Sequence, residues 1–156
     1  MIHSVLDSPI GELLLVGDGH VLHELHMLDA PARSPHPRDD AALAGVRAQL
    51  QEYFAGERRA FDVALELAGT PFQREVWQAL LAIPYGETIS YGELARRVGR
   101  PWGSRAVGAA NGRNPIAVIV PCHRVIGADG TLTGYGGGLE RKRTLLELER
   151  GVLSLA

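Results

Sequence analysis

The sequence predicts an α+β fold in which an antiparallel sheet carrying a helix precedes a mostly helical C-terminal region. Two observations support this prediction. In the first 70 residues, short apolar or alternating segments are separated by turns rich in Gly, Pro and Asp. Beyond Gly69, Thr70 and Ser90 are each followed three residues later by Gln or Glu, a pattern typical of helix starts. We therefore predict two domains, residues 1–69 and residues 70–156.

In the N-terminal half, the turns at 7–11 and 17–19 separate three predicted strands. The prolines between about 29 and 40 indicate an exposed loop. Helical spacing of apolar residues then predicts a helix over about 40–55, which Gly56 can end. The clean alternation over 61–67 predicts a fourth strand.

In the C-terminal half, Thr70 to Gln73 forms a predicted capping box that opens a helix to about residue 83. Two short helices, Ser90 to Val98 and about 103–112, follow closely enough to form a helix-turn-helix. The apolar run 116–120 reads as a buried strand, and 139–150 as a final helix. One stripe of that helix carries Lys142, Leu145, Leu146 and Glu149. Glu149 on an apolar stripe favours a buried role, although an exposed acid at its edge fits equally well.

Composition and charge exclude several classes of protein. The chain has 156 residues, 46% of them hydrophobic, but no apolar run long enough to span a membrane and no N-terminal pattern of a secretory signal. We therefore expect a cytoplasmic protein. Residues 1–70 hold 5 Arg against 11 acids, whereas residues 71–156 hold 11 basic residues against 7 acids. This asymmetry favours a polyanion-facing surface in the C-terminal half.

Cys122 is the single cysteine, so neither an intrachain disulfide nor a cysteine-rich zinc site is possible. Its thiol is either an inert buried group or a reactive one. It ends a buried apolar run, which would place it at the mouth of a possible site. We expect no metal at His20, His23 and His26, because alternation along a strand turns His23 away from the other two.

The second helix of the predicted helix-turn-helix has almost only small side chains. Arg105 is its one long residue, and the small ones include Ser104, Ala106, Gly108 and Ala109. A helix that reads the major groove would carry several long polar side chains. Small residues with one long cation suit a helix pressed into the minor groove, whereas close helix–helix packing is the alternative.

Taken together, the C-terminal motifs resemble those of the methylated-DNA–protein-cysteine methyltransferases, also called O6-alkylguanine-DNA alkyltransferases. Seven segments carry the resemblance in the family's order and cover nearly all of residues 70–150. They are Thr70-Pro71-Phe72-Gln73, Ile83-Pro84-Tyr85-Gly86-Glu87-Thr88, Ser90-Tyr91, Arg105-Ala106-Val107-Gly108, Asn114-Pro115, Pro121-Cys122-His123-Arg124-Val125-Ile126-Gly127 and Gly134-Tyr135-Gly136-Gly137-Gly138. The N-terminal half resembles the family's ribonuclease-H-like domain more weakly.

The resemblance implies direct, irreversible repair of O6-alkylguanine, and less efficiently of O4-alkylthymine, with one alkyl group transferred per protein. Cys122 is then the alkyl acceptor. His123 deprotonates it through a water, Glu149 orients the imidazole, and Asn114 braces the turn behind them. No cofactor or metal is expected.

The resemblance also implies that a monomer binds double-stranded DNA through the minor groove. Tyr91 would rotate the nucleotide and donate to guanine N3, while Arg105 fills the gap in the base stack. The carbonyls of Cys122 and Val125 would bind the guanine amino group, and Tyr135 and the Gly136 amide would face O6. Ala117, where some family members have proline, would leave a roomier pocket for bulky groups such as benzyl.

Two other functions fit parts of the pattern. A Cys–His–Glu arrangement also serves cysteine hydrolases, which would turn over on esters or amides. A helix-turn-helix also suits a lesion-binding or regulatory module without catalysis, although such relatives replace the cysteine that is present here.

Overall fold

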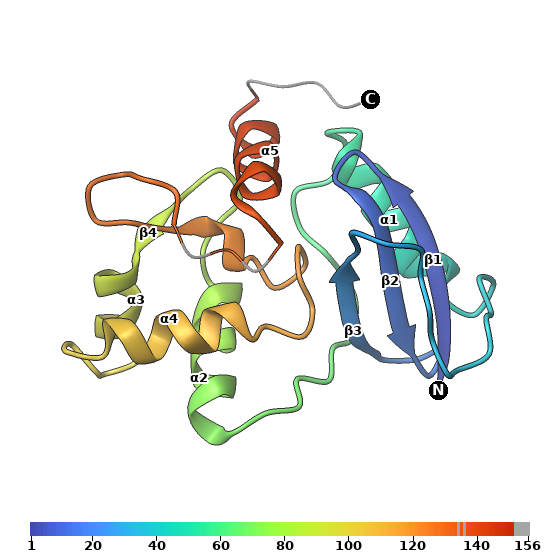
Figure 1. Ribbon diagram of the computed structural model, residues 1–156, viewed down its shortest axis with the longest axis horizontal. Coiled ribbons are helices and arrows are strands. Elements are labelled where there is room, and N and C mark those ends of the chain that lie inside the picture. The colour runs from blue at the N-terminus through green and yellow to red at the C-terminus, as the bar shows by residue number, and fades with distance from the viewer. Residues whose placement is uncertain (134, 136, 152–156) are drawn as a thin grey trace.

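The computed structural model describes residues 1–133, 135 and 137–151, and Figure 1 shows its two halves side by side. Three strands and one helix form the N-terminal half: β1 (Ile2–Ser8), β2 (Gly11–Gly17), β3 (Leu22–Met27) and α1 (Ala44–Phe54). The C-terminal half holds α2 (Pro71–Leu81), β4 (Ile89–Ser90), α3 (Tyr91–Arg97), α4 (Ser104–Gly112), the 3₁₀ turn η1 (Cys122–Arg124), β5 (Val125–Ile126) and α5 (Leu139–Glu149). The predicted α+β class is confirmed.

The N-terminal sheet is antiparallel in the order β1-β2-β3, and α1 packs beside it (Figure 1). Its strands are joined by the predicted turns, of which Asp18-Gly19 is fixed by bonds from the His20 and Val21 amides to the Asp18 carboxylate. The helix α1 buries Val46, Leu50, Tyr53 and Phe54 against the core. It begins four residues later than the spacing predicted, after a turn at 40–43.

Two predicted strands are wrong. Residues 61–67 keep alternating burial, but the backbone pairs only at Leu65, through bonds from Leu22 N to Ala64 O and from Glu66 N to Leu22 O. Residues 116–120 are buried as predicted, yet they form successive turns and pair with β3 only at Ile116. Apolar patterning records which residues are buried, whereas a strand also needs a backbone partner along its whole length.

The C-terminal helices match their predicted starts and ends closely. Thr70 and Gln73 form both halves of the capping box at the start of α2. The Ser90 hydroxyl accepts from the Glu93 backbone amide at the start of α3. The Glu93 carboxylate pairs with Arg96 and Arg97 instead of accepting from the Ser90 backbone amide, as a full capping box would require. Helices α3 and α4 pack together as a helix-turn-helix. The Trp77 indole of α2 donates to the Ala110 carbonyl of α4 at 2.8 Å, which ties this pair to α2.

One hydrophobic core runs through both halves. It joins residues of the sheet and α1 to residues of α2, α3, α4 and α5. Helix α5 lies between the sheet and the C-terminal helices in Figure 1, and its Arg141 donates to the carbonyls of Ile10 and Leu28 in the N-terminal half. No helix among the described residues is long and apolar enough to cross a bilayer.

Candidate active site and nucleic-acid interface

Cys122 stands at the first position of η1, immediately after the buried turns of residues 116–120. The Asn114 side chain holds these turns: its Nδ2 donates to the Val120 carbonyl at 2.8 Å and its Oδ1 accepts from the Ile116 amide at 3.0 Å. Asn114 therefore bridges the two ends of the segment that leads into Cys122. Its predicted role, bracing the turn behind Cys122, stays a prediction.

The same segment contains the single non-glycine residue with a positive φ among those described, Val118 at φ 71°. The Ile119 amide donates to the Ala117 carbonyl across it at 2.8 Å, which makes a three-residue turn. A β-branched residue in this region is strained, and such strain persists only where surrounding contacts enforce it. Burial of residues 116–120 and the Asn114 bridge enforce it here, next to Cys122.

The Cys122 thiol is 6% exposed and lies among groups that affect its ionisation. Burial raises its pKa, while hydrogen bonds with Asn114 and Tyr135 and the charge of Lys142 act in the opposite direction. The net effect is upward, so the thiol is protonated at neutral pH. A nearby base is therefore required before the sulfur can act as a nucleophile.

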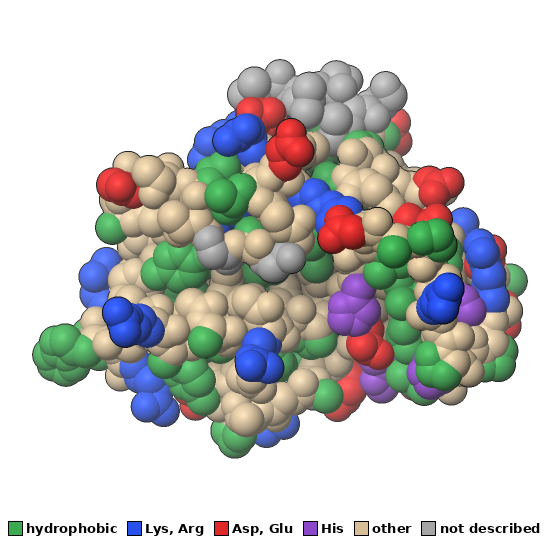
Figure 2. Space-filling view, viewed as in Figure 1, with side chains coloured by type: hydrophobic (Ala, Val, Ile, Leu, Met, Phe, Trp, Pro, Cys, Tyr) green, Lys and Arg blue, Asp and Glu red, His purple; other side chains and the backbone are tan. Residues whose placement is uncertain are grey.

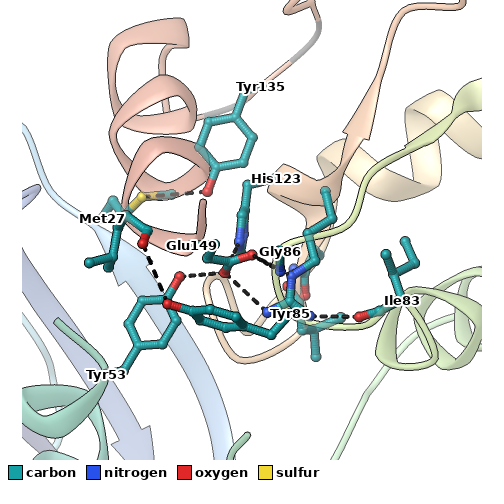
Figure 3. Close-up of polar contacts among 12 residues, drawn as sticks. Met27, Tyr53, Ile83, Tyr85, Gly86, His123, Tyr135 and Glu149 are labelled. Atoms are coloured by element: carbon teal, nitrogen blue, oxygen red, sulfur yellow. Dashed lines mark hydrogen bonds and ion pairs between the residues drawn. The ribbon is translucent and has the colours of Figure 1, made fainter. Parts of the chain in front are cut away.

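His123 is fully buried and is the candidate for that base. Its Nε2 lies 2.7 Å from Glu149 Oε2, and its Nδ1 has no hydrogen-bond partner among the described residues (Figure 3). An ionised carboxylate can only accept, so Nε2 carries the proton and Nδ1 keeps its lone pair. Burial lowers the pKa of His123 despite the nearby Glu149, which keeps the imidazole neutral and able to take a proton.

Glu149 is held as a carboxylate by several donors. Burial by itself would raise its pKa, but hydrogen bonds from His123 and Arg124 outweigh this effect and hold the pKa well below its usual range. Arg124 donates to Oε1 through Nε at 2.8 Å and to Oε2 through Nη2 at 3.0 Å. Of the two roles left open for Glu149, the buried one is correct.

Three partners of this site carried no predicted role. Arg124 anchors Glu149 and also donates to the Ile83 carbonyl at 2.6 Å. Tyr53 reaches Glu149 from α1, 96 positions earlier in the chain. Lys142 is fully buried, and its Nζ donates to the Thr133 carbonyl at 2.7 Å between the rings of Tyr91 and Tyr135. Burial lowers the pKa of Lys142 to about 8.

A pocket of about 200 Å³ opens in front of Cys122. Both halves of the chain line it: Leu25, His26 and Met27 from β3, and Asn111, Gly112, Asn114, Ala117, Cys122, Tyr135 and Gly137 from the C-terminal half. Of the predicted pocket residues, Ala117 and Tyr135 line it, and the Tyr135 hydroxyl donates to the Met27 sulfur at 3.8 Å. Sequence reasoning missed the contribution of β3, because nothing in a strand pattern says what it faces.

The remaining predicted pocket residues lie elsewhere or outside the described part. Val125 is buried in β5, paired with Ile89, and Tyr91 begins α3; neither is among the residues that line the pocket. The Cys122 carbonyl accepts from the side-chain amide of Asn111 at 3.3 Å and from the backbone amide of Val125. Gly136 lies outside the described residues.

The Tyr91 side chain, half-buried, lies close to both the site and α4. Its hydroxyl donates to the Thr133 carbonyl at 3.0 Å, and its ring lies 3.7 Å from where a Cβ on Gly108 would stand. That distance is an ordinary contact, and a Cβ on Gly112 would meet nothing within 4 Å. Close packing therefore does not require glycine at either position, which weighs against the packing alternative for α4.

The outer face of α4 is exposed and made of small residues with one cation. Ser104, Arg105, Ala106 and Ala109 are all exposed. Arg96, Arg97, Arg100 and Arg113 are exposed around this helix, and Figure 2 shows basic side chains spread over the side of the molecule where α3 and α4 lie. A narrow, small-residue ridge with basic flanks fits a nucleic-acid groove.

Two family models match the chain. Residues 71–151 match "6-O-methylguanine DNA methyltransferase, DNA binding domain", and residues 1–67 match "6-O-methylguanine DNA methyltransferase, ribonuclease-like domain". These matches agree with the predicted ribonuclease-like N-terminal fold and with a DNA-binding C-terminal region.

Curated relatives and solved structures agree with this assignment. A methylated-DNA–protein-cysteine methyltransferase of Mycobacterium tuberculosis is 60% identical over 96% of this chain and 93% of the relative. One of Methanosarcina acetivorans is 50% identical over 96% and 98%. The crystal structure of Mycobacterium tuberculosis OGT in complex with DNA superimposes with a TM-score of 0.92 at 58% identity, over 97% of this chain and 94% of that one. The chain therefore belongs to the 6-O-methylguanine DNA methyltransferase family.

Proposed function

We propose that this protein repairs DNA by moving an alkyl group from O6 of guanine, and less efficiently from O4 of thymine, to the sulfur of Cys122. The observation that carries the proposal is a buried Cys122 facing a pocket beside the His123–Glu149 pair. Family membership and the DNA complex of a close relative support it.

The proposed reaction breaks the bond between O6 and the alkyl carbon and forms a bond between that carbon and Sγ. The thiol proton passes through a water to Nδ1 of His123, and the imidazolium that forms is stabilised by Glu149. The guanine anion that leaves is protonated, with the Tyr91 hydroxyl as the proposed donor at N3, and the proton taken up by His123 returns through solvent to the Tyr91 phenolate. The product is a thioether, which has no carbonyl for water to attack, so each molecule reacts once.

Reaching the alkyl group requires the base to leave the helix, which costs a few kcal/mol. We propose that the exposed face of α4 enters the minor groove, that Arg105 occupies the gap in the base stack, and that Tyr91 helps to rotate the nucleotide. Tyr135, Ala117 and the carbonyls of Cys122 and Val125 would then contact the extruded base. Because Cys122 O and Tyr91 OH already have partners within the protein, these contacts require local rearrangement.

The proposed organisation follows from these roles. The ranges of the two family models support a division near residue 69 into an N-terminal domain and a C-terminal domain that binds DNA and accepts the alkyl group. We propose that the protein acts as a monomer, without cofactor or metal, in the cytoplasm where its DNA substrate is available.

The test uses an oligonucleotide duplex that contains O6-methylguanine. We expect one equivalent of protein to repair one equivalent of lesion, with the intact mass rising by one methyl group on the peptide that contains Cys122. Cys122→Ala should bind the same duplex and transfer nothing. Catalytic turnover on ester or amide substrates would favour a hydrolase instead, and binding without transfer by the parent protein would favour a lesion-binding module.

A further inference from the structure

Tyr53 connects the N-terminal domain to the proton-transfer pair of the C-terminal one. It comes from α1, is fully buried, and its hydroxyl lies 2.5 Å from Oε2 of Glu149. The same oxygen accepts from His123 Nε2 at 2.7 Å (Figure 3). The phenol and the imidazole therefore share one carboxylate oxygen.

The Tyr53 ring is fixed in place by other aromatic rings. Phe54 meets it edge-on at 5.2 Å between centroids, Phe61 lies at 5.3 Å and Tyr85 at 6.2 Å. A phenol held this firmly aims its hydroxyl at Glu149 with little loss of conformational entropy. The contact is therefore built by the packing of α1 and the segment after it.

We propose that Tyr53 is a positioning residue for alkyl transfer, which keeps His123 neutral and aligned by drawing electron density from the Glu149 carboxylate. The proposal rests on the transfer chemistry proposed above. Each donor on a carboxylate weakens its attraction for a neighbouring imidazolium. A Glu149 without the Tyr53 bond would attract a protonated His123 more strongly. His123 would then stay protonated, and unable to act as a base, up to a higher pH.

A substitution of Tyr53 alone leaves the other charged and titratable groups around His123 and Glu149 in the chain. His123 also interacts with Arg124 and Lys142, and Glu149 also interacts with Arg124, Tyr85 and Tyr135. Arg59 stacks over the Tyr85 ring at 5.5 Å. Tyr53→Phe removes one hydroxyl and keeps the ring, so the aromatic packing and both Arg124 bonds to Glu149 are retained.

The experiment compares single-turnover rates of methyl transfer between pH 5.5 and 9 for the parent, Tyr53→Phe and Tyr85→Phe. Tyr85 is the matched control, because it lies against Tyr53 but its hydroxyl donates to the Leu148 carbonyl at 3.5 Å and not to the carboxylate. In Tyr53→Phe we expect the acid limb of the profile to move upward by roughly 0.5 to 1 pH unit. Tyr85→Phe should leave it in place.

A second readout does not depend on activity. Proton NMR titration of the imidazoles, with the His123 signal assigned by its loss in His123→Asn, should show the same upward shift in Tyr53→Phe. An unchanged His123 titration in a folded Tyr53→Phe protein, or an equal shift in Tyr85→Phe, would overturn the proposal. If the parent transfers no alkyl group, the proposed function fails, while the titration still decides whether Tyr53 acts on His123.

Should Tyr53→Phe not fold, the parent itself provides the test. A hydroxyl proton held between Tyr53 and Glu149 exchanges slowly and resonates at low field. A nuclear Overhauser effect between this proton and the His123 ring protons would support the proposal. Absence of the low-field signal at low temperature would refute it.

Discussion

At the scale of single residues, burial sets the chemistry of this site. The Cys122 thiol and the His123 imidazole both lose their charged forms when water is removed, so each is neutral in the folded protein. Glu149 behaves in the opposite way because Arg124, His123 and Tyr53 surround it with donors. A neutral thiol, a neutral imidazole and an ionised carboxylate are thus present in this site.

Glu149 should make stability depend on acid pH. Its folded pKa lies below the unfolded value, so its contribution is complete above about pH 4.5 and is lost as the pH falls toward the folded pKa. Glu149→Gln should lower the free energy of unfolding at pH 7 by about 3–5 kcal/mol, because buried Arg124 loses its partner. Urea unfolding at pH 7, 5 and 4 should show that the free energy of unfolding falls less steeply with decreasing pH in the variant than in the parent. Equal slopes would contradict the assigned ion pair.

Ala117 should set the size of alkyl group that the pocket accepts. The Ala117 amide donates to the Leu25 carbonyl at 3.1 Å, so a proline there would remove a bond between the two halves as well as fill space. Ala117→Val adds bulk and keeps the amide. It should slow reaction with O6-benzylguanine about tenfold or more and change reaction with O6-methylguanine in DNA much less. An equal effect on both substrates would show that the pocket wall does not discriminate by size.

At the scale of elements, α4 departs from what helix propensity favours, with Gly108 and Gly112 in nine residues. Neighbouring atoms among the described residues would tolerate a Cβ at both positions, so packing within the folded chain does not require glycine there. The exposed face of α4 is the candidate contact with DNA. Arg105 stands on that face, where its side chain is free to leave the surface.

Bulk added to the exposed face of α4 should therefore weaken DNA binding without unfolding the protein. Ala109→Gln should lower affinity for a lesion duplex about tenfold, measured by fluorescence anisotropy at fixed salt. The free energy of unfolding should change by less than about 0.5 kcal/mol, because an exposed helical Gln is nearly as favourable as Ala. Ala48→Gln, an exposed alanine within α1, is the control and should bind normally. Unaltered binding by both variants would remove α4 from the interface.

At the scale of the whole molecule, the two halves share one hydrophobic core. Residues of β3 line the pocket of Cys122, Tyr53 of α1 binds Glu149, and Ala117 bonds to Leu25. Arg141 adds a further link, since its guanidinium donates to the carbonyls of Ile10, Leu28 and Gly137. The N-terminal half thus supports the pocket as well as the core.

Loss of the Arg141 link should weaken the whole molecule. Arg141→Met keeps much of the aliphatic stem but leaves three carbonyls without their donor, so the free energy of unfolding should fall by about 1–3 kcal/mol. Arg143→Met, at an exposed position of the same helix, should change it by less than about 0.5 kcal/mol. Both should unfold in a single transition. Two transitions in Arg141→Met would show that the halves are independently stable.

Local sequence was enough to predict where the helices begin and end and which protein family the chain resembles. Thr70 to Gln73, Ser90 with Glu93, and Gly99 mark helix ends through contacts within a few residues, so they can be read without a fold. Cys122 and His123 are neighbours in the chain, and the motifs around them are specific enough to point to the family. The burial of residues 116–120 followed from apolar patterning alone, whereas patterning left the burial of Glu149 open.

Only the tertiary structure decided the conformations and contacts that depend on distant partners. Residues 61–67 and 116–120 have the pattern of strands, yet β3 offers each of them pairing at a single residue. The unpartnered Nδ1 of His123, the clamp of Arg124 on Glu149, and the approach of Tyr53 across 96 positions arise from packing between separate elements. Periodicity reports how much of each side chain is buried, but it carries no information about which distant group a buried side chain meets. The sequence therefore predicted Cys122 as the alkyl acceptor, and the fold decided the buried environment that raises the pKa of its thiol.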